Sequence, residues 1–319
     1  MDHIVHHTTL RTSATTNKRT QKNVYFKMEN QQKTGAFKFR GASYKLMRLT
    51  DEQLACGVIT ASAGNHAQGL ALAAYKLGVK ATIYMAESTP DAKVEATRGY
   101  GAEVVLIGES FQEAYEASVE HQKKCGATYV HPFDDYDIMA GQGTIALELL
   151  EQESRIDTIM VPIGGGGLIS GIAVAAKSVK PNIRVIGVQA ASAAATHTAY
   201  HEGAVKKLDK VSTIAEGIAV KQPGEKTLPI IRHYVDDIIT VSEAEIAHAI
   251  IYMLERGKTL VEGAGAAGLA GLLSHNDKID SRHCGVIVSG GNLDISKLSH
   301  IQALARQLKP EVSHKALVL

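Results

Sequence analysis

Short runs of apolar residues alternate with longer segments of helical periodicity along most of the 319-residue chain. The apolar runs are three to five residues long and rich in β-branched side chains, which is the pattern of buried strands. Predicted strands cover residues 24–28, 57–61, 81–85, 103–107, 128–130, 158–162, 184–188, 238–241 and 286–288. Predicted helices cover residues 40–47, 51–54, 67–77, 90–100, 110–124, 145–151 and 169–178. Strands that alternate with helices in this way predict βαβ units and parallel sheets.

The segment His131–Asp135 interrupts the alternation with a turn-like sequence, and we interpret it as a crossing between two domains. The predicted fold class is α/β, with two open, mainly parallel three-layer domains. Residues 1–30 and 133–319 are expected to form a large domain and residues 31–132 a small one, with residues 8–23 as a loop entering the large domain. Open α/β sheets bind ligands at the carboxyl ends of their strands, so we expect the active site in the cleft between the domains.

Composition and charge narrow the classes of function. The chain is 45% apolar and 21% charged, as ordinary globular proteins are. A formal net charge of +1 and an aromatic content of 5% without Trp argue against nucleic-acid and membrane partners. No run approaches the roughly 18 apolar residues of a membrane span. Three scattered cysteines without CxxC spacing fit the reducing cytoplasm.

Lys38 follows Phe37 and a turn of small residues, and it leads into a helical pattern. A lysine just inside a helix start faces the positive end of the helix dipole, which disfavours its ammonium form. The free amine is the form that Schiff-base chemistry with a carbonyl cofactor requires. A solvated surface lysine is the alternative for this position taken alone, so the prediction depends on the other motifs.

Two glycine motifs lead to different interpretations. Gly164–Gly167 lie between a predicted strand and a predicted helix, where backbone N–H groups can turn toward a phosphate. A tight strand-to-helix turn is the alternative, and no lysine follows in the spacing of a nucleoside triphosphate site. Gly263–Gly268 match GxGxxG, but no convincing βαβ unit surrounds them. We therefore predict a closely packed helix of small residues there.

Two further stretches could present polar groups to a ligand. Ser62–His66 form a polar turn before a predicted helix, so their side chains either cap that helix or join its N–H groups in binding a carboxylate. His66 could act as a general base, although local packing is the commoner role of such a histidine. Ser289 follows a predicted strand and runs into glycines, where its hydroxyl would project into the cleft or simply lie in a turn.

Taken together, these stretches resemble the pyridoxal-5′-phosphate enzymes of the tryptophan synthase β family (fold type II). Within that family, the chain is similar to the single-module, catabolic-type threonine dehydratases and the serine racemases. The matching stretches occur in the family's order between about Tyr25 and Asn292, and they are residues 33–42, 62–69, 131–134, 140–144, 164–168, 262–265 and 289–292.

The resemblance implies a role for each residue, with the large domain binding the cofactor. Lys38 would bind pyridoxal 5′-phosphate as a Schiff base and then act as the base at the substrate Cα, and Phe37 would pack on the ring. The implied cofactor contacts are Gly164, Gly165, Gly166, Gly167 and Leu168 for the phosphate, Asn65 for the ring oxygen and Ser289 for the ring nitrogen. The implied substrate-binding residues are Ser62, Ala63, Gly64, Asn65, His66 and Gln142.

The implied reaction is dehydration of L-threonine and L-serine to 2-oxobutyrate or pyruvate and ammonia, in amino acid catabolism or isoleucine biosynthesis. Serine racemases carry a serine where Ala63 stands and typically an arginine where Phe111 stands, so both positions favour the dehydratase. The alternatives are a serine racemase, a 3-hydroxyaspartate dehydratase or, outside the enzymes, a phosphate-ligand-binding protein.

The resemblance also bears on partners and regulation. The expected small-molecule partner is a 3-hydroxy amino acid, and the expected assembly is a homodimer or homotetramer. Gln189 and Ala195 stand where some relatives have an acidic pair, so no metal site is expected. The chain ends at Leu319, which leaves no room for a C-terminal regulatory domain, and isoleucine feedback is not expected.

Overall fold

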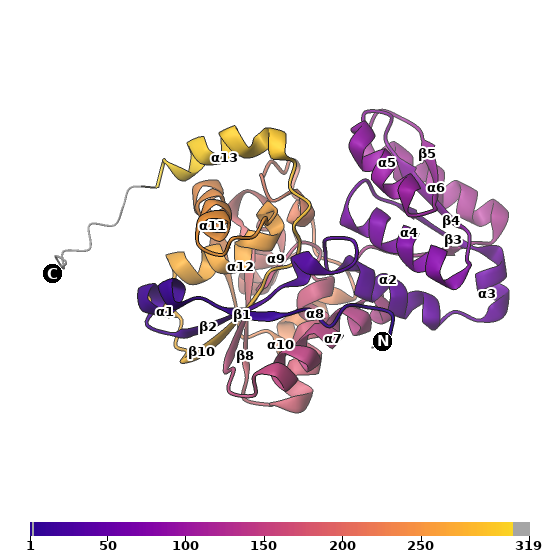
Figure 1. Ribbon diagram of the computed structural model, residues 1–319. Coiled ribbons are helices and arrows are strands. Elements are labelled where there is room, and N and C mark those ends of the chain that lie inside the picture. The colour runs from indigo at the N-terminus through magenta and orange to yellow at the C-terminus, as the bar shows by residue number, and fades with distance from the viewer. Residues whose placement is uncertain (2, 309–319) are drawn as a thin grey trace, which may run out of the picture.

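The computed structural model, which describes residue 1 and residues 3–308, has two domains, each built on a sheet (Figure 1). The larger sheet has six strands in the order β1-β2-β10-β7-β8-β9, and the smaller has four in the order β5-β4-β3-β6. All neighbouring strands are parallel except β1 and β2. The strands are β1 Leu10–Thr12, β2 Asn23–Lys27, β3 Val58–Ala61, β4 Ala81–Met85, β5 Glu103–Leu106, β6 Thr128–Tyr129, β7 Thr158–Pro162, β8 Arg184–Ala190, β9 Asp237–Val241 and β10 His283–Ile287.

The helices that pack on these sheets make each domain three-layered, as predicted. They are α1 Ala14–Thr20, α2 Lys38–Met47, α3 Asp51–Cys56, α4 Asn65–Leu77, α5 Asp91–Gly99, α6 Phe111–Cys125, α7 Tyr136–Gln152, α8 Gly167–Val179, α9 Ala195–Glu202, α10 Thr227–Tyr234, α11 Glu243–Glu255, α12 Gly263–Ser274 and α13 Leu298–Ala305. Five short 3₁₀ turns, among them η1 Glu29–Gln31 and η3 Glu216–Ile218, complete the described elements.

Alternating side chains of the strands build a separate core on each face of the large sheet. On β2, Val24 and Phe26 pack with α11, α12 and α13, whereas Tyr25 packs on the opposite face with α7, α8 and α10. This two-sided burial explains why the strands read as short continuous apolar runs. The small sheet follows the same scheme, because Ile83 faces α2 and α4 while Ile59 faces α6.

The structure corrects two predictions near the N-terminal and central parts of the chain. Residues 8–23 are not simply a loop, because they contain β1, which pairs antiparallel with β2, and α1, which Ser13 caps. The helix predicted from residue 145 begins at Tyr136, where Asp135 caps it. The turn-like character of His131–Asp135 is confirmed, because residues 132–135 form a series of bends before α7. Within residues 3–308, no helix is long and apolar enough to cross a membrane.

Candidate active site

Lys38 is the first residue of α2, and its amine lies at the boundary between the two domains. The preceding residues join the large sheet, since Ala36 bridges to Gly290 and the Phe37 N–H donates to the Ser289 carbonyl at 3.0 Å. The Lys38 Nζ donates to the Pro132 carbonyl at 2.6 Å and lies 5.3 Å from the centre of the Phe37 ring. Burial lowers the pKa of the Lys38 amine to about 8, although the Glu262 carboxylate partly opposes this. Roughly one amine in ten is therefore neutral at pH 7.

The glycine loop, Gly164–Gly167, joins β7 to α8 as the sequence predicts. Gly166 has φ +99°, a conformation that favours glycine, and a Cβ on Gly167 would lie 2.8 Å from the Phe133 carbonyl. The carbonyls of Gly164 and Gly165 accept from the Thr196 and Thr227 hydroxyls, the latter at 2.7 Å, whereas the Gly166 carbonyl accepts from the Ser170 N–H of α8 at 3.0 Å. Within residues 3–308, no acceptor pairs with the N–H groups of residues 164–168. A loop of this kind can bind a phosphate.

The turn Ser62–His66 places the start of α4 beside the lysine. Among the residues that the structure describes, no side chain caps α4: its N-cap is Gly64, and the Ser62 hydroxyl accepts from the Gly64 N–H at 3.4 Å. Of the two interpretations of this turn, helix capping by side chains is therefore wrong. The His66 Nε2 donates to the Val130 carbonyl at 2.9 Å, and burial beside Lys38 lowers the pKa of His66 to about 3. His66 is accordingly a neutral ring whose proton is already engaged.

Asn65 is held by a relay of hydrogen bonds that the sequence did not reveal. Its Nδ2 donates to the Glu262 Oε1 at 2.7 Å, and its Oδ1 accepts from the Asn292 Nδ2 at 2.8 Å. Asn292 also donates to the Thr34 carbonyl at 2.8 Å. These bonds fix which end of the Asn65 amide faces which partner, and they leave one N–H free for a ligand. Burial raises the pKa of Glu262 to about 7.

Glu262 lies in residues 262–265, one of the stretches that resemble the family, but the resemblance implies no role for it. It precedes α12, and its carboxylate lies so close to Gly290 that a Cβ there would collide with it. The helix that it begins contains the GxGxxG match, which confirms a buried helix of small residues in place of a dinucleotide loop. The only local signal for Glu262 was an acidic residue beside glycines at a helix start.

Ser289 and Gln142 differ in what their side chains contact. Ser289 is buried after β10, and within residues 3–308 its hydroxyl has no hydrogen-bond partner, so it is available to a ligand. Gln142 is buried on α7, where its Oε1 accepts from the Gly41 N–H of α2 at 3.1 Å. This contact supports the first turn of the lysine helix, and substrate binding by Gln142 stays a prediction.

The crossing segment connects the lysine to the glycine loop. The His131 Nδ1 accepts from the N–H groups of Phe133 and Asp134 at 3.2 and 2.8 Å, and burial lowers the pKa of His131 to about 4. The Asp134 carboxylate accepts from the Lys226 and Thr227 N–H groups at 2.9 and 3.1 Å. Because Thr227 also binds the glycine loop, one short segment fixes both ends of the site.

The donors at the site define the kind of molecule that fits. A partly neutral lysine can bond to a carbonyl carbon, the free N–H groups of the glycine loop suit a phosphate, and the Ser289 hydroxyl suits a ring nitrogen. The glycine loop and Ser289 follow the carboxyl ends of β7 and β10, and the turn Ser62–His66 follows that of β3, where open α/β sheets bind ligands. The residues present therefore fit a phosphorylated carbonyl cofactor such as pyridoxal 5′-phosphate.

Comparison with known proteins agrees with this chemistry. The chain is 53% identical to an L-threonine ammonia-lyase of Geobacter sulfurreducens over 276 residues, covering 86% of this chain and 69% of that protein. It is 45% identical to an L-threonine ammonia-lyase of Thermotoga maritima, covering 94% of this chain and 75% of that protein.

The chain is also similar to solved structures of a threonine deaminase and a serine racemase. The processed form of threonine deaminase isoform 2 from Solanum lycopersicum matches with a TM-score of 0.93 at 38% identity, covering 96% of this chain and 85% of that one. Maize serine racemase matches with a TM-score of 0.89 at 40% identity, covering 95% of this chain and 93% of that one. The family described as "Pyridoxal-phosphate dependent enzyme" matches residues 2–290. The chain belongs to this family of pyridoxal-phosphate dependent enzymes.

Proposed function

We propose that this protein is a pyridoxal-phosphate dependent L-threonine ammonia-lyase that also accepts L-serine. Its products are 2-oxobutyrate, or pyruvate from serine, and ammonia. The observation that carries the proposal is the Lys38 amine, which lies with a lowered pKa beside unpaired donors suited to a phosphorylated ring. The similarity to two named L-threonine ammonia-lyases supports the choice of substrate.

Five features of the chain would hold the cofactor. The N–H groups of the glycine loop and Leu168 bind the phosphate, Asn65 donates its free N–H to the ring oxygen, and Ser289 meets the ring nitrogen. Phe37 packs beside the ring, and Lys38 provides the covalent attachment. When bound, the cofactor acts as an electron sink for the substrate's Cα. Ser289 carries no charge, unlike an aspartate, so it does not hold the ring nitrogen protonated.

The same residues orient the substrate and move its proton. The uncapped N–H groups at the start of α4 suit the substrate carboxylate, with Ser62 beside them. The Lys38 Nζ takes the Cα proton, which its lowered pKa permits near neutral pH. Ala63 has no group that can carry a proton, so return of a proton to a second face, as racemization requires, has no donor at that position. This favours elimination over racemization.

The test is direct. The purified protein should show the visible absorbance of the bound cofactor and should form 2-oxo acid from threonine. Lys38→Ala should abolish both. A steady-state panel of threonine, serine and threo-3-hydroxyaspartate, with D-serine measured alongside 2-oxo acid, separates the lyase from the racemase and from the 3-hydroxyaspartate enzyme. A protein that binds no cofactor, or that makes D-serine faster than 2-oxo acid, contradicts the proposal.

Three broader expectations accompany the proposal. The division into residues 1–30 with 133–319 and residues 31–132 is supported by the small sheet, whose strands all fall between residues 58 and 129. Limited proteolysis would test these boundaries. A homodimer or homotetramer and a cytoplasmic location stay predictions, which light scattering and fractionation would test.

A further inference from the structure

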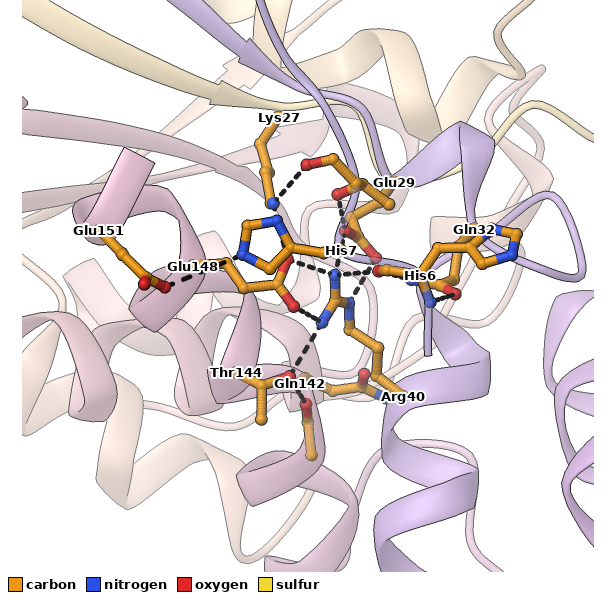
Figure 2. A network of polar contacts seen from close by, with 12 residues as sticks. His6, His7, Lys27, Glu29, Gln32, Arg40, Gln142, Thr144, Glu148 and Glu151 are labelled. Atoms are coloured by element: carbon orange, nitrogen blue, oxygen red, sulfur yellow. Dashed lines mark hydrogen bonds and ion pairs between the residues drawn. The ribbon is translucent and has the colours of Figure 1, made fainter. Parts of the chain in front are cut away.

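Four charged side chains meet behind the lysine helix, and the chemistry proposed above uses none of them. They are Lys27 at the end of β2, Glu29 in η1, Arg40 in α2 and Glu148 in α7, and we call them the four-charge network (Figure 2). The side chains of Lys27, Glu29 and Arg40 are fully buried, and that of Glu148 is 13% exposed. Two positive and two negative charges balance, so the network is neutral overall.

Arg40 is the centre of the network, because it pairs with both carboxylates in two-pronged fashion. Its Nε and Nη2 donate to Glu29 at 2.8 Å each, and its Nη1 and Nη2 donate to Glu148 at 2.5 and 2.8 Å. Nη1 also donates to the Thr144 hydroxyl at 3.2 Å. All the guanidinium nitrogens are thus engaged, and the plane of the group is fixed in direction as well as in place.

Lys27 completes the network from the large sheet. Its Nζ donates to Glu148 at 2.7 Å, to the Thr8 carbonyl at 2.8 Å and to Gln152 at 3.1 Å. The Glu29 carboxylate also accepts from the Thr8 hydroxyl at 2.5 Å. The network therefore joins the large sheet, the N-terminal segment and α7 to a single side chain of α2.

The four-charge network holds α2 close to the reacting Lys38 amine. Arg40 is two residues after Lys38, in the first turn of α2. On the α7 side of that turn, a Cβ on Gly141 would lie 2.6 Å from the Gly41 Cα, so the two helix backbones are in direct contact. Gln142 binds the Gly41 N–H from the same side. The start of α2 is therefore held from two directions, and Lys38 projects from the part that is held.

Stability alone does not account for such a network. Removing charged groups from water costs several kcal/mol per ion, and buried ion pairs can often be replaced by apolar groups without loss of stability. Two-pronged hydrogen bonds between an arginine and two carboxylates do fix the geometry of the groups, which an apolar contact does less well. A displacement of about 1 Å at a reacting group can cost on the order of 100-fold in rate.

We propose that Arg40 is a positioning residue, which through Glu29 and Glu148 fixes the first turn of α2 so that the Lys38 amine meets the carbonyl of its cofactor. This inference rests on the proposed function of Lys38. It adds that the placement of the amine depends on a network outside the set of residues proposed to hold the cofactor and the substrate.

The test uses Arg40→Lys, which keeps the charge but cannot form two forks. Cofactor-free protein is mixed with pyridoxal 5′-phosphate, and the rate at which the visible absorbance appears is followed against pH. We expect the rate to fall by about 10-fold or more in Arg40→Lys, and its pH dependence to move because Lys38 changes surroundings. Circular dichroism and thermal unfolding verify that the variant is folded. If Arg40→Lys does not fold, Glu148→Gln, which keeps the side-chain size, is judged by the same readout.

Lys45→Met is the matched control. Lys45 lies on α2 as well, and it pairs with Asp135 at 2.8 Å and Asp137 at 3.0 Å, so it also joins α2 toward α7, but near the other end of the helix. We expect its capture rate to stay within about twofold of the wild type, because its ion pairs lie near the C-terminal end of α2, more than a turn away from Lys38. A folded Arg40→Lys with unchanged capture rate and pH dependence, even if its melting temperature is lower, overturns the inference. Failure of the wild type to capture the cofactor would instead overturn the proposed function.

Discussion

Replacing the buried Lys38 amine should stabilise the cofactor-free protein, and by an amount that depends on pH. In the unfolded chain the amine has its ordinary pKa of 10.5, whereas burial lowers the pKa to about 8 in the folded protein. The unfolded state therefore binds more protons between these two values, and the stability of the wild type rises with pH across this window. Below pH 8 both states are charged, and the folded protein carries the full cost of burying the ammonium.

The magnitude follows from the two pKa values. At about 1.4 kcal/mol for each tenfold change, the stability difference between wild type and Lys38→Met should change by roughly 2 to 3 kcal/mol from pH 7 to pH 10. Loss of the bond to the Pro132 carbonyl costs Lys38→Met about 1 kcal/mol at every pH. We therefore expect Lys38→Met to be the more stable protein at pH 7, with its advantage lost as the pH rises toward 10.5.

Urea unfolding of both cofactor-free proteins at several pH values measures this difference. Lys45→Met serves as the control, because two aspartates raise the pKa of Lys45 and its contribution is lost only above pH 10.5. Its stability difference from the wild type should be nearly flat from pH 7 to pH 10. A flat difference for Lys38→Met as well, or one of opposite slope, would refute the argument that burial neutralises the amine. The Glu262 carboxyl, whose pKa is about 7, changes its charge below most of the range between pH 8 and pH 10.5, so its titration is separate from that of Lys38.

Two other substitutions test the site from its opposite sides. Gly165→Ala places a Cβ against the Phe133 ring, so it should distort the loop and weaken binding of pyridoxal 5′-phosphate by about 10-fold or more, as equilibrium titration would show. Gly99→Ala, which has open space around it, is the control and should bind normally. Glu262→Gln removes a carboxylate that raises the pKa of Lys38, so the pH profile of cofactor capture should move to lower pH. A profile that stays in place would show that the two groups do not interact, and one that moves to higher pH would contradict the sign of the interaction.

Most strands, and the helices between them as far as α8, could be predicted from the sequence, because each βαβ unit has a local pattern of apolar residues; α9, α10 and α11 were not predicted. The first half of α7 could not, since Gly141 and Gly143 suggest a turn. The structure shows why they are glycines: Gly141 packs on Gly41, and a Cβ on Gly143 would lie 2.8 Å from the Gly171 carbonyl. Such close helix crossings depend on neighbours far along the chain, which a local pattern does not contain.

The same reasoning explains what was predicted at the site. Lys38, the glycine loop and Ser289 each follow a strand or begin a helix, so their positions could be inferred locally. The role of Glu262 could not be inferred locally, because its hydrogen-bond partner Asn65 is 197 residues away in the sequence. The helix α1 was missed for a similar reason. Its Thr16 hydroxyl lies 3.0 Å from the Tyr252 hydroxyl, and these two residues are 236 positions apart in the sequence.

The relay through Asn65 ties the orientation of one amide to the arrangement of the whole molecule. Asn65 is carried by the four-stranded half, whereas Glu262 and Asn292 are carried by the six-stranded half. If the halves moved apart, the amide would lose both neighbours and could rotate freely. A competent donor thus exists only while the two halves are together, so assembly of the site and closure of the molecule become a single event.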